Sequence, residues 1–450
     1  MSRAQEVAKR HPPLLHRLLE ARRKTDDLFN IVKPDSLYDR PIAERHRIVF
    51  YIGHLEAFDW NLLRERHLNG KSFNSEFDKL FSFGIDPVDD GLPIDQPGNW
   101  PPIEDVRGYV NSARSSIDEG LAALNSSDWQ AKADSDDSIE TLMNVAVEHR
   151  LMHAETLAYM FHQLPYRQKT EIALCPSLVT APMESRMIDI PAGHAALGVS
   201  RDEDSGFGWD NEYEAYTTHV PAFAIKNHKV TNRQFLEFVE AGGYDDPGCW
   251  AAHDWEWKRA NGIQHPIFWE RSADGLHYRT MFHEIPLPMD WPVYVSHAEA
   301  SAYARWAAKS LPTEAQWHRA AYGAPQGTKE NADRAYPWGN EPPNPRRGNF
   351  DFTSWDPAPV GAFPAGSSAF GVSDLLGNGW EWTSSPFEPF PGFKPFSFYP
   401  GYSADFFDGK HYVIKGGSAR TAASLLRRSF RNWFQPHYQY VYAGFRCVSN

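Results

Sequence analysis

The pattern of hydrophobic and polar positions divides the chain into two parts. In the first part, apolar residues recur at intervals of three and four, the spacing of one face of an α-helix. This spacing predicts helices at about residues 4–30, 42–67 and 103–124, and a fourth through LMNVAVEHRLMHAETLAYMFHQL with Asp136 or Ser138 as its N-cap. Their connections suit antiparallel neighbours, so we predict a four-helix bundle, a fold whose core commonly holds metal sites.

After Pro176 the apolar runs become short, and glycine, proline and tryptophan punctuate the chain. MIDIPAGHAALGV predicts a strand pair joined by a turn, and VPAFAIKNHKVTN predicts a strand that leads into the helix NRQFLEFVEAGG. A further helix is expected at SHAEASAYARWAAKS, followed by loops and short strands over 312–450. We place the boundary between Pro176 and Glu184, and we expect an α+β chain with a helical domain at 1–180 and a loop-rich domain at 181–450.

Length and composition indicate a folded protein with more than one domain. The chain has 450 residues, of which 42% are hydrophobic and 23% are charged. No apolar run of about 18 residues predicts a membrane span, and the first residues, MSRAQEVAKRHPP, have no apolar segment typical of a signal peptide. A net charge of −13 argues against nucleic-acid binding, which needs a basic surface. We expect neither nucleic acid nor a membrane as a partner.

Cysteine usage indicates the compartment. The three cysteines, Cys175, Cys249 and Cys447, are too few and too scattered for a disulfide framework, and no CxxC motif is present. A reducing cytoplasm is therefore expected.

Two histidines stand four residues apart in VEHRLMHAET. In a helix, His149 and His153 lie on one face, close enough to share an ion, although such a pair also occurs on surfaces and in cores. Glu155 is two positions further on and faces elsewhere.

A third ligand has to come from a neighbouring helix. His54, in FYIGHLEAFDW, is the best donor, because it lies among apolar residues and Gly53 allows close approach; Glu56 and Asp59 compete with it. Three neutral imidazoles with open positions suit a catalytic zinc or Fe(II) ion, and spacing alone does not choose between the two.

Four motifs follow one another in the second part: LPTEAQWHRAA, YPWGNE, FGVSDLLGNGWEWTSS and IKGGSA…RRSFRNW…AGFRCV. Over about Arg186 to Val448 they resemble the formylglycine-generating-enzyme/sulfatase-modifying family, whose fold is C-type-lectin-like. Formylglycine-generating enzymes use a cysteine pair late in the domain, whereas Cys447 is the single cysteine of the last 200 residues here. A cysteine-pair oxidase is not expected. Gly379, in GNGWEW, stands where valine is more usual.

The first part, with GHLEAFDW and EHRLMHAETLAYMFHQLP, resembles a DinB-like bundle. A DinB-like bundle fused to this lectin-like module resembles the sulfoxide synthases of ergothioneine biosynthesis, a family that includes selenoneine synthases as close relatives. The resemblance implies that His54, His149 and His153 bind a non-haem Fe(II). It further implies an O2-dependent enzyme that joins the sulfur of cysteine or γ-glutamylcysteine to C2 of the imidazole of hercynine.

The same resemblance implies roles for residues of the second part. Tyr399 and Tyr402, in FSFYPGYSADFF, match the loop that carries the family's catalytic tyrosine; Tyr399 is expected to donate the proton and Tyr402 to help hold hercynine. Asn432 and Trp433, in RNWFQPH, match the strand that contacts hercynine, and an aromatic face suits its trimethylammonium group.

Two departures from the family bear on the substrates. Met152 stands where some members carry a glutamine that contacts hercynine. The loop FGIDPVDDGLPIDQP has four aspartates and lacks the arginines with which some members receive γ-glutamylcysteine. Free cysteine is therefore favoured, with a carboxylate partner among Arg420, Arg427, Arg428 and Arg431.

Other functions remain open on the sequence. One alternative is a selenoneine synthase that uses a selenosugar; others are a non-catalytic binding module and a zinc-dependent DinB-like thiol transferase. The oligomeric state is not determined by the sequence.

Overall fold

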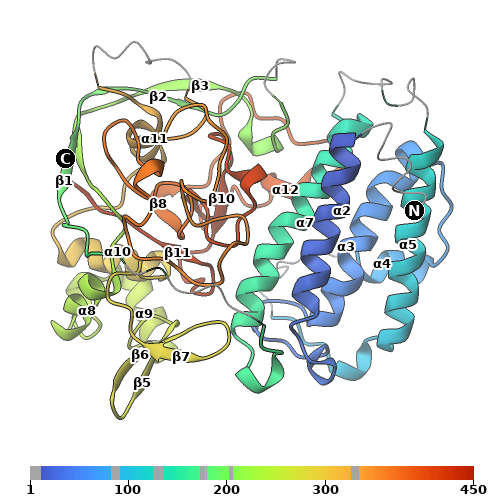
Figure 1. The fold of residues 1–450 in the computed structure, drawn as a ribbon, viewed down its shortest axis with the longest axis horizontal. Helices are drawn as coiled ribbons and strands as arrows, with labels where there is room; N and C mark the ends of the chain where they lie inside the picture. The colour runs from blue at the N-terminus through green and yellow to red at the C-terminus, as the bar shows by residue number, and fades with distance from the viewer. Residues whose placement is uncertain are drawn as a thin grey trace. The chain divides into compact units, whose positions relative to one another are not determined.

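The computed structural model of the protein describes residues 12–82, 92–124, 129, 136–172, 178, 180–201, 206–325 and 334–449. The chain divides into two compact units (Figure 1). The N-terminal unit comprises residues 1–172 together with Phe396–Phe398, and the C-terminal unit comprises residues 173–395 and 399–450. Cys175 and three of the four aspartates of the loop at residues 83–97 lie outside the described residues.

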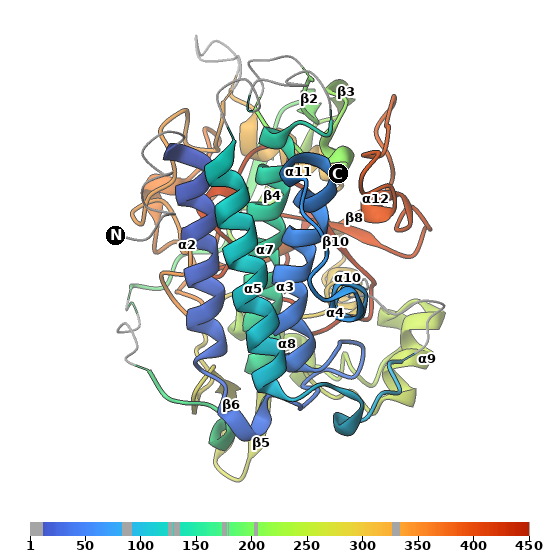
Figure 2. The ribbon, with the colours of Figure 1, turned by 90° about the vertical axis from the view of Figure 1, so that its right-hand side faces the viewer.

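Four long helices make up most of the described part of the N-terminal unit and lie side by side in two views (Figures 1 and 2). They are α2 (Pro12–Phe29), α3 (Ile48–Leu63), α5 (Ile103–Ala123) and α7 (Ile139–His162). Helix α2 packs against α7, and α3 packs against both α5 and α7. A shorter helix, α4 (Ser75–Leu80), contacts α3. No described helix combines the length and apolar character that crossing a bilayer requires.

These helices confirm the four predicted segments, with differences at their ends. Ser138 is the N-cap of α7, because its hydroxyl accepts a hydrogen bond from the Thr141 amide at 3.1 Å. Helix α3 begins at Ile48, six residues later than predicted, and after Leu63 it continues as a π-helical turn over Arg64–Leu68. Helix α4 is not among the predicted helices, since six residues give too little periodicity to detect.

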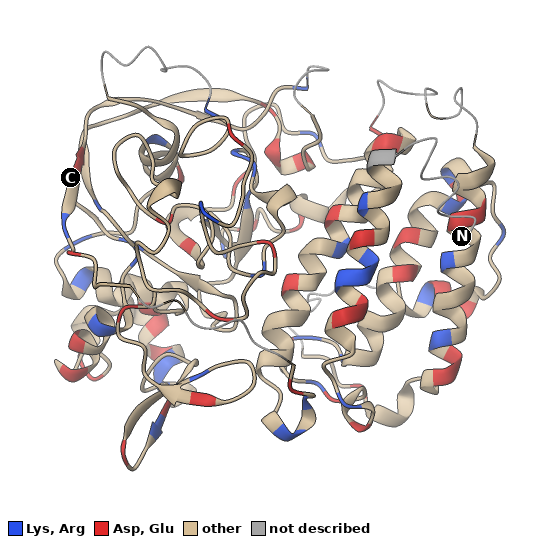
Figure 3. Cartoon of the chain, viewed as in Figure 1, with Lys and Arg blue, Asp and Glu red and all other residues tan. Residues whose placement is uncertain are grey.

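Acidic and basic side chains are interspersed along the helices of the N-terminal unit (Figure 3). Several of them pair between helices, as Arg22 of α2 does with Asp118 of α5 at 2.8 Å, and Arg114 of α5 with Asp26 of α2 at 2.7 Å. These pairs join α2 to α5 across the bundle.

Short strands form four small sheets among the described residues of the C-terminal unit. One sheet has the order β1 (Met187–Ile190), β4 (Phe223–Lys226) and β12 (Val448–Ser449). A second has the order β10 (Asn432–Phe434), β9 (Tyr412–Lys415), β8 (Trp380–Pro386) and β11 (Ala443–Gly444). The others are β2 (Gly193–Leu197) with β3 (Tyr216–Val220), and β5 (Trp269–Ser272), β6 (Gly275–Arg279) and β7 (Glu284–Pro286).

The predicted strand pair in MIDIPAGHAALGV is wrong in its pairing. Both strands form, but β1 pairs antiparallel with β4, and β2 pairs antiparallel with β3. The two residues between them are Pro191 and Ala192. A two-residue hairpin turn needs residues that accept positive φ, which proline cannot adopt, so the two strands pair elsewhere.

Five helices accompany these sheets in the described part of the unit. They are α8 (Asn232–Glu240), α9 (Ala252–Ala260), α10 (His297–Trp306), α11 (Glu314–Tyr322) and α12 (Gly401–Ala404). Helices α8 and α10 confirm the predictions, whereas α11 falls in a region predicted to be mostly loops and strands. A capping box of Thr313 and Gln316 marks the start of α11, a signal that the sequence does contain.

A buried ionic cluster holds the loop before β8. Arg446 donates to both carboxylate oxygens of Glu381 at 2.6 Å, and Lys229 pairs with Glu381 at 3.2 Å and donates to the Gly377 carbonyl at 3.1 Å. Gly379, in the same loop, has a φ of 109°, and a Cβ there would lie 2.5 Å from Cε1 of Tyr294. Backbone conformation and the approach of Tyr294 explain why glycine stands at this position.

Candidate metal centre and substrate-binding residues

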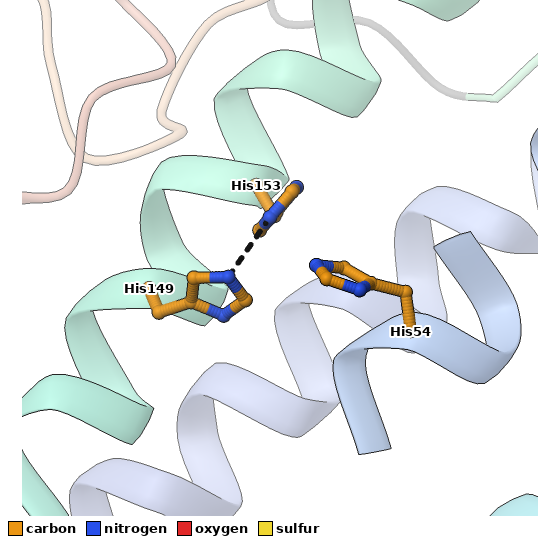
Figure 4. Close-up of side chains that lie close together, drawn as sticks. All are labelled: His54, His149 and His153. Atoms are coloured by element: carbon orange, nitrogen blue, oxygen red, sulfur yellow. Dashed lines mark hydrogen bonds between the residues drawn. The ribbon is translucent and has the colours of Figure 1, made fainter. Parts of the chain in front are cut away.

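Three histidines of the N-terminal unit converge in its interior (Figure 4). His54 comes from α3, and His149 and His153 come from successive turns of α7. One ring nitrogen of each lies within 4.8 Å of those of the other two. All three side chains are buried. The structure thus brings together the three histidines that the sequence singles out.

Two of the nitrogens, both from α7, have the spacing of neighbouring ligands on one ion. Nε2 of His149 and Nε2 of His153 lie 3.1 Å apart. Two nitrogens that bind one divalent ion at about 2.1 Å and at right angles lie about 3.0 Å apart, so the spacing suits neighbouring ligands. Nε2 of His54 is buried and has no hydrogen-bond partner. The same holds for Nδ1 of His149 and for Nδ1 of His153. Buried nitrogens without partners are costly, and an ion would satisfy those that face the centre.

A backbone carbonyl fixes the tautomer of His54. Its Nδ1 lies 2.7 Å from the carbonyl oxygen of Phe81, the residue that follows α4. Because a carbonyl only accepts, Nδ1 carries the hydrogen and Nε2 keeps the lone pair that can bind a metal. Gly53 makes this contact possible, since a Cβ there would lie 2.6 Å from the Phe81 ring. The sequence predicts a close approach at Gly53 but does not identify the partner.

Burial keeps the histidines neutral, and aromatic rings stack on two of them. Phe58 stacks on His149 with ring centroids 3.5 Å apart, and Phe50 stacks on His54 at 4.9 Å. Burial lowers the pKa of His54 to about 4, despite the hydrogen bond to the Phe81 carbonyl that opposes it. Burial, followed by the neighbouring imidazoles, holds the pKa values of His149 and His153 well below the usual range. Neutral imidazole is the form that binds metals.

Glu56 and Asp59, the competing donors, have other partners. Arg150 donates to Glu56 at 2.9 Å, to Asp59 at 2.6 Å and to the Leu55 carbonyl at 3.0 Å. Arg114 donates to Glu56 at 2.8 Å. These arginines engage both carboxylates. Met152, between the two histidines of α7, is half-buried.

Tyr402 lies in an aromatic cluster of the C-terminal unit. Its ring stacks on Trp209 with centroids 4.1 Å apart, meets the edge of Trp433 at 5.6 Å, and lies 5.4 Å from the ring of Tyr399. Trp433 in turn stacks on Phe387 at 4.1 Å. The two tyrosines and Trp433 are half-buried, so the cluster is partly open to a ligand.

A buried polar turn that was not predicted from the sequence anchors the tyrosine segment. The turn is the 3-10 helix Asp210–Glu212, which follows Trp209 directly. Ser403 of α12 donates to Asp210 at 2.5 Å and accepts from Asn211 Nδ2 at 3.0 Å. The run WDNE, with three polar residues after an aromatic one, is the only signal of it in the sequence.

The remaining predicted substrate residues have internal partners. Asn432 accepts from the Trp433 amide through its side chain at 2.8 Å. Arg431 is 2% exposed; it donates to Glu314 at 3.1 Å and to the carbonyls of Asn211 and Glu388 at 3.2 and 3.1 Å. Arg420 lies over the Trp355 ring at 3.7 Å and donates to the Phe352 carbonyl at 3.2 Å. Arg427 donates to both oxygens of Glu212. A substrate carboxylate would therefore have to share donors with the protein.

Two family models match the chain. A DinB superfamily domain matches residues 17–157, and a sulfatase-modifying factor enzyme 1-like domain matches residues 176–450. The first matched region is helical, and the second combines helices with small sheets. This arrangement confirms the predicted α+β class.

Relatives named hercynine oxygenase align with most of the chain. The protein of Mycobacterium tuberculosis is 36% identical over 349 residues, which cover 76% of this chain and 77% of that protein. The protein of Mycolicibacterium smegmatis is 36% identical over 382 residues, 80% of this chain and 86% of that protein. Ergothioneine biosynthesis protein 1 of Neurospora crassa is 28% identical over 501 aligned positions, which cover 92% of this chain and 55% of that protein. With both domains and these relatives, the chain belongs to the hercynine oxygenase family of oxidative enzymes.

Proposed function

We propose that the protein is a non-haem Fe(II), O2-dependent sulfoxide synthase of ergothioneine biosynthesis. It would join the sulfur of a thiol to C2 of the imidazole of hercynine and oxidise that sulfur to the sulfoxide. O2 accepts four electrons, two from forming the C–S bond and two from forming the sulfoxide; one oxygen atom enters the product and the other leaves as water. The convergence of three buried, neutral histidines with unpartnered nitrogens carries this proposal.

His54, His149 and His153 would hold the iron, which supplies the redox chemistry with O2 when bound. The protein's own contribution is to keep the three rings neutral and oriented. Burial keeps the rings neutral. The Phe81 carbonyl and the stacked rings of Phe50 and Phe58 orient them.

Tyr399 would donate a proton from its hydroxyl, and Tyr402 would help to hold hercynine. Trp433 and Asn432 would receive the trimethylammonium and carboxylate groups. The half-buried cluster of Tyr402 and Trp433 supports this assignment, because aromatic faces attract a cation that has no hydrogen to donate.

Free cysteine is the thiol that the chain favours. Asp95 accepts hydrogen bonds from Arg40, from Arg47 at 2.9 Å and from Trp100 at 2.7 Å, so the two arginines beside this loop already pair with a carboxylate of the protein. That pairing supports a donor with few carboxylates over γ-glutamylcysteine. Arg420 and Arg431 stay candidate partners for the cysteine carboxylate.

The test is anaerobic reconstitution with Fe(II), followed by O2 uptake with hercynine and, in turn, cysteine, γ-glutamylcysteine and a selenosugar. We expect uptake and a sulfoxide product with cysteine. His54→Ala should lose iron binding and uptake, whereas His16→Ala, which removes an exposed histidine of α2, should keep both.

Other outcomes favour other functions. Turnover only with the selenosugar would indicate a selenoneine synthase. Activity with zinc and without O2 would indicate a thiol transferase, and failure to bind metal would indicate a non-catalytic module. We propose the cytoplasm as the compartment, supported by the free buried cysteines Cys249 and Cys447.

A further inference from the structure

Two histidines and an aspartate form a second cluster, in the C-terminal unit. His253 and Asp254 are adjacent in the first turn of α9, and His437 lies in the turn after β10. Oδ1 of Asp254 lies 3.1 Å from Nε2 of His253 and 2.8 Å from Nε2 of His437. One ligand atom of each residue lies within 4.8 Å of those of the other two. The cluster shares no residue with the three-histidine centre.

The carboxylate of Asp254 lacks a permanent counter-charge. Its side chain is buried, and among the described residues its ion-pair partners are the two histidines alone. A buried carboxylate requires a compensating charge, and hydrogen bonds alone do not supply one. A divalent ion would supply that charge.

Neighbouring residues hold His437 in place. The Trp257 ring stacks on the His437 ring with centroids 4.4 Å apart and planes 2° from parallel. The Ala298 amide at the start of α10 donates to the Pro436 carbonyl at 3.1 Å, which fixes the backbone just before His437.

A further histidine accompanies the cluster. His297, the first residue of α10, is 7% exposed, and its Nε2 has no hydrogen-bond partner. Asp254 and His437 are both electrostatic neighbours of this ring. His297 is not one of the three clustered residues, but its buried nitrogen is a further polar group of this region without a protein partner.

We infer that His253, Asp254 and His437 bind a second divalent ion of the class that includes zinc, cobalt and nickel. Two imidazoles and one carboxylate are the ligands that this class prefers. Because His253 is exposed, the site opens to solvent and can take its ion from solution. The bound ion would join α9 to the turn that ends β10.

The test is titration of the metal-free, full-length protein with Co(II), counting bound equivalents by equilibrium dialysis. We expect two equivalents for the unaltered protein and one for His437→Ala or Asp254→Asn. We expect one for His153→Ala, none for His153→Ala combined with His437→Ala, and two for the control His16→Ala. Melting curves of every variant check that it folds.

Trp257 gives a second readout of the same site. In the His153→Ala protein, Co(II) should quench tryptophan fluorescence, and Trp257→Phe or His437→Ala should each remove that quenching. If His153→Ala alone abolishes all Co(II) binding, the second site is overturned while the proposed iron centre stands. If His437→Ala loses an equivalent and His153→Ala loses none, the second site stands and the proposed iron centre fails.

Discussion

At the scale of single residues, the candidate metal centre depends on groups of other residues that orient the histidines. His54 has its usable lone pair on Nε2 because the Phe81 carbonyl binds Nδ1. Phe81 reaches that position because Gly53 leaves room for its ring. Partners of this kind typically change metal affinity without touching the ion.

Gly53→Ala should therefore weaken metal binding. The new Cβ would lie 2.6 Å from the Phe81 ring and displace its carbonyl from His54, so we expect about 10–100-fold lower affinity for Fe(II) or Co(II), measured by titration. Gly108→Ala is the matched control. A Cβ at Gly108 in α5 meets nothing within 4 Å, so this change should leave affinity unchanged and raise stability by up to about 1 kcal/mol. Equal affinities for the two variants would contradict the role of Phe81.

The two tyrosines should separate in steady-state kinetics. Tyr399→Phe removes the proposed proton donor and should lower kcat by about 100-fold or more, with little change in the KM for hercynine. Tyr402→Phe keeps the ring that stacks on Trp209, so it should affect kcat less. A larger loss of kcat in Tyr402→Phe than in Tyr399→Phe would indicate that Tyr402 donates the proton and that Tyr399 helps to hold hercynine.

At the scale of elements, the bundle is joined by charges as well as by apolar packing. Arg150 of α7 binds Glu56, Asp59 and the Leu55 carbonyl of α3, the helix that carries His54. The same contacts set α3 against α7, and so set His54 against His149 and His153. Arg150 lowers the pKa of Glu56, which is about 2 although burial opposes this.

Arg150→Met should destabilise the protein by about 3–5 kcal/mol, because it leaves the buried Asp59 carboxylate without its partner and removes one of the partners of Glu56. The measurement is the free energy of unfolding by urea. Arg23→Met, which removes the exposed pair with Asp27, should change it by less than about 0.5 kcal/mol. A small effect of Arg150→Met would show that Arg114 and Arg22, which lies 3.9 Å from Glu56, compensate for its loss.

At the scale of the whole molecule, buried histidines make the stability depend on pH. Burial lowers the pKa of His228 to about 4, below its ordinary 6.5, although a hydrogen bond to the Lys229 carbonyl opposes the shift. Between these values the unfolded chain binds a proton that the folded chain excludes. The contribution of His228 to stability is therefore fully present above pH 6.5 and decreases as the pH falls toward 4.

His228→Gln should make this decrease shallower. The slope of the unfolding free energy between pH 6.5 and 4 should fall by up to about 1.4 kcal/mol per pH unit relative to the unaltered protein. Urea unfolding at several pH values measures the slope, and the two proteins should have parallel curves above pH 7. Identical slopes down to pH 4 would mean that His228 takes up its proton in the folded state.

The sequence by itself determined the helices of the bundle and singled out the three histidines of the candidate metal centre. Helical periodicity is a local property, so α2, α3, α5 and α7 could be predicted, as could the common face of His149 and His153. Pairing between distant segments is not local. The partners of β1 and β2 and the turn Asp210–Glu212 depend on contacts that periodicity does not encode, whereas α11 has a local capping box in its sequence.

The tertiary structure decided which groups surround each histidine. Glu56 and Asp59 compete with His54 on spacing alone, and only the position of Arg150 on the neighbouring helix engages them elsewhere. The Phe81 carbonyl has no signal in the sequence, because every residue has one. His253, Asp254 and His437 meet across 183 positions, counted from Asp254 to His437, and only the folded chain brings them together. Residue types supply the possible ligands, and packing decides their partners.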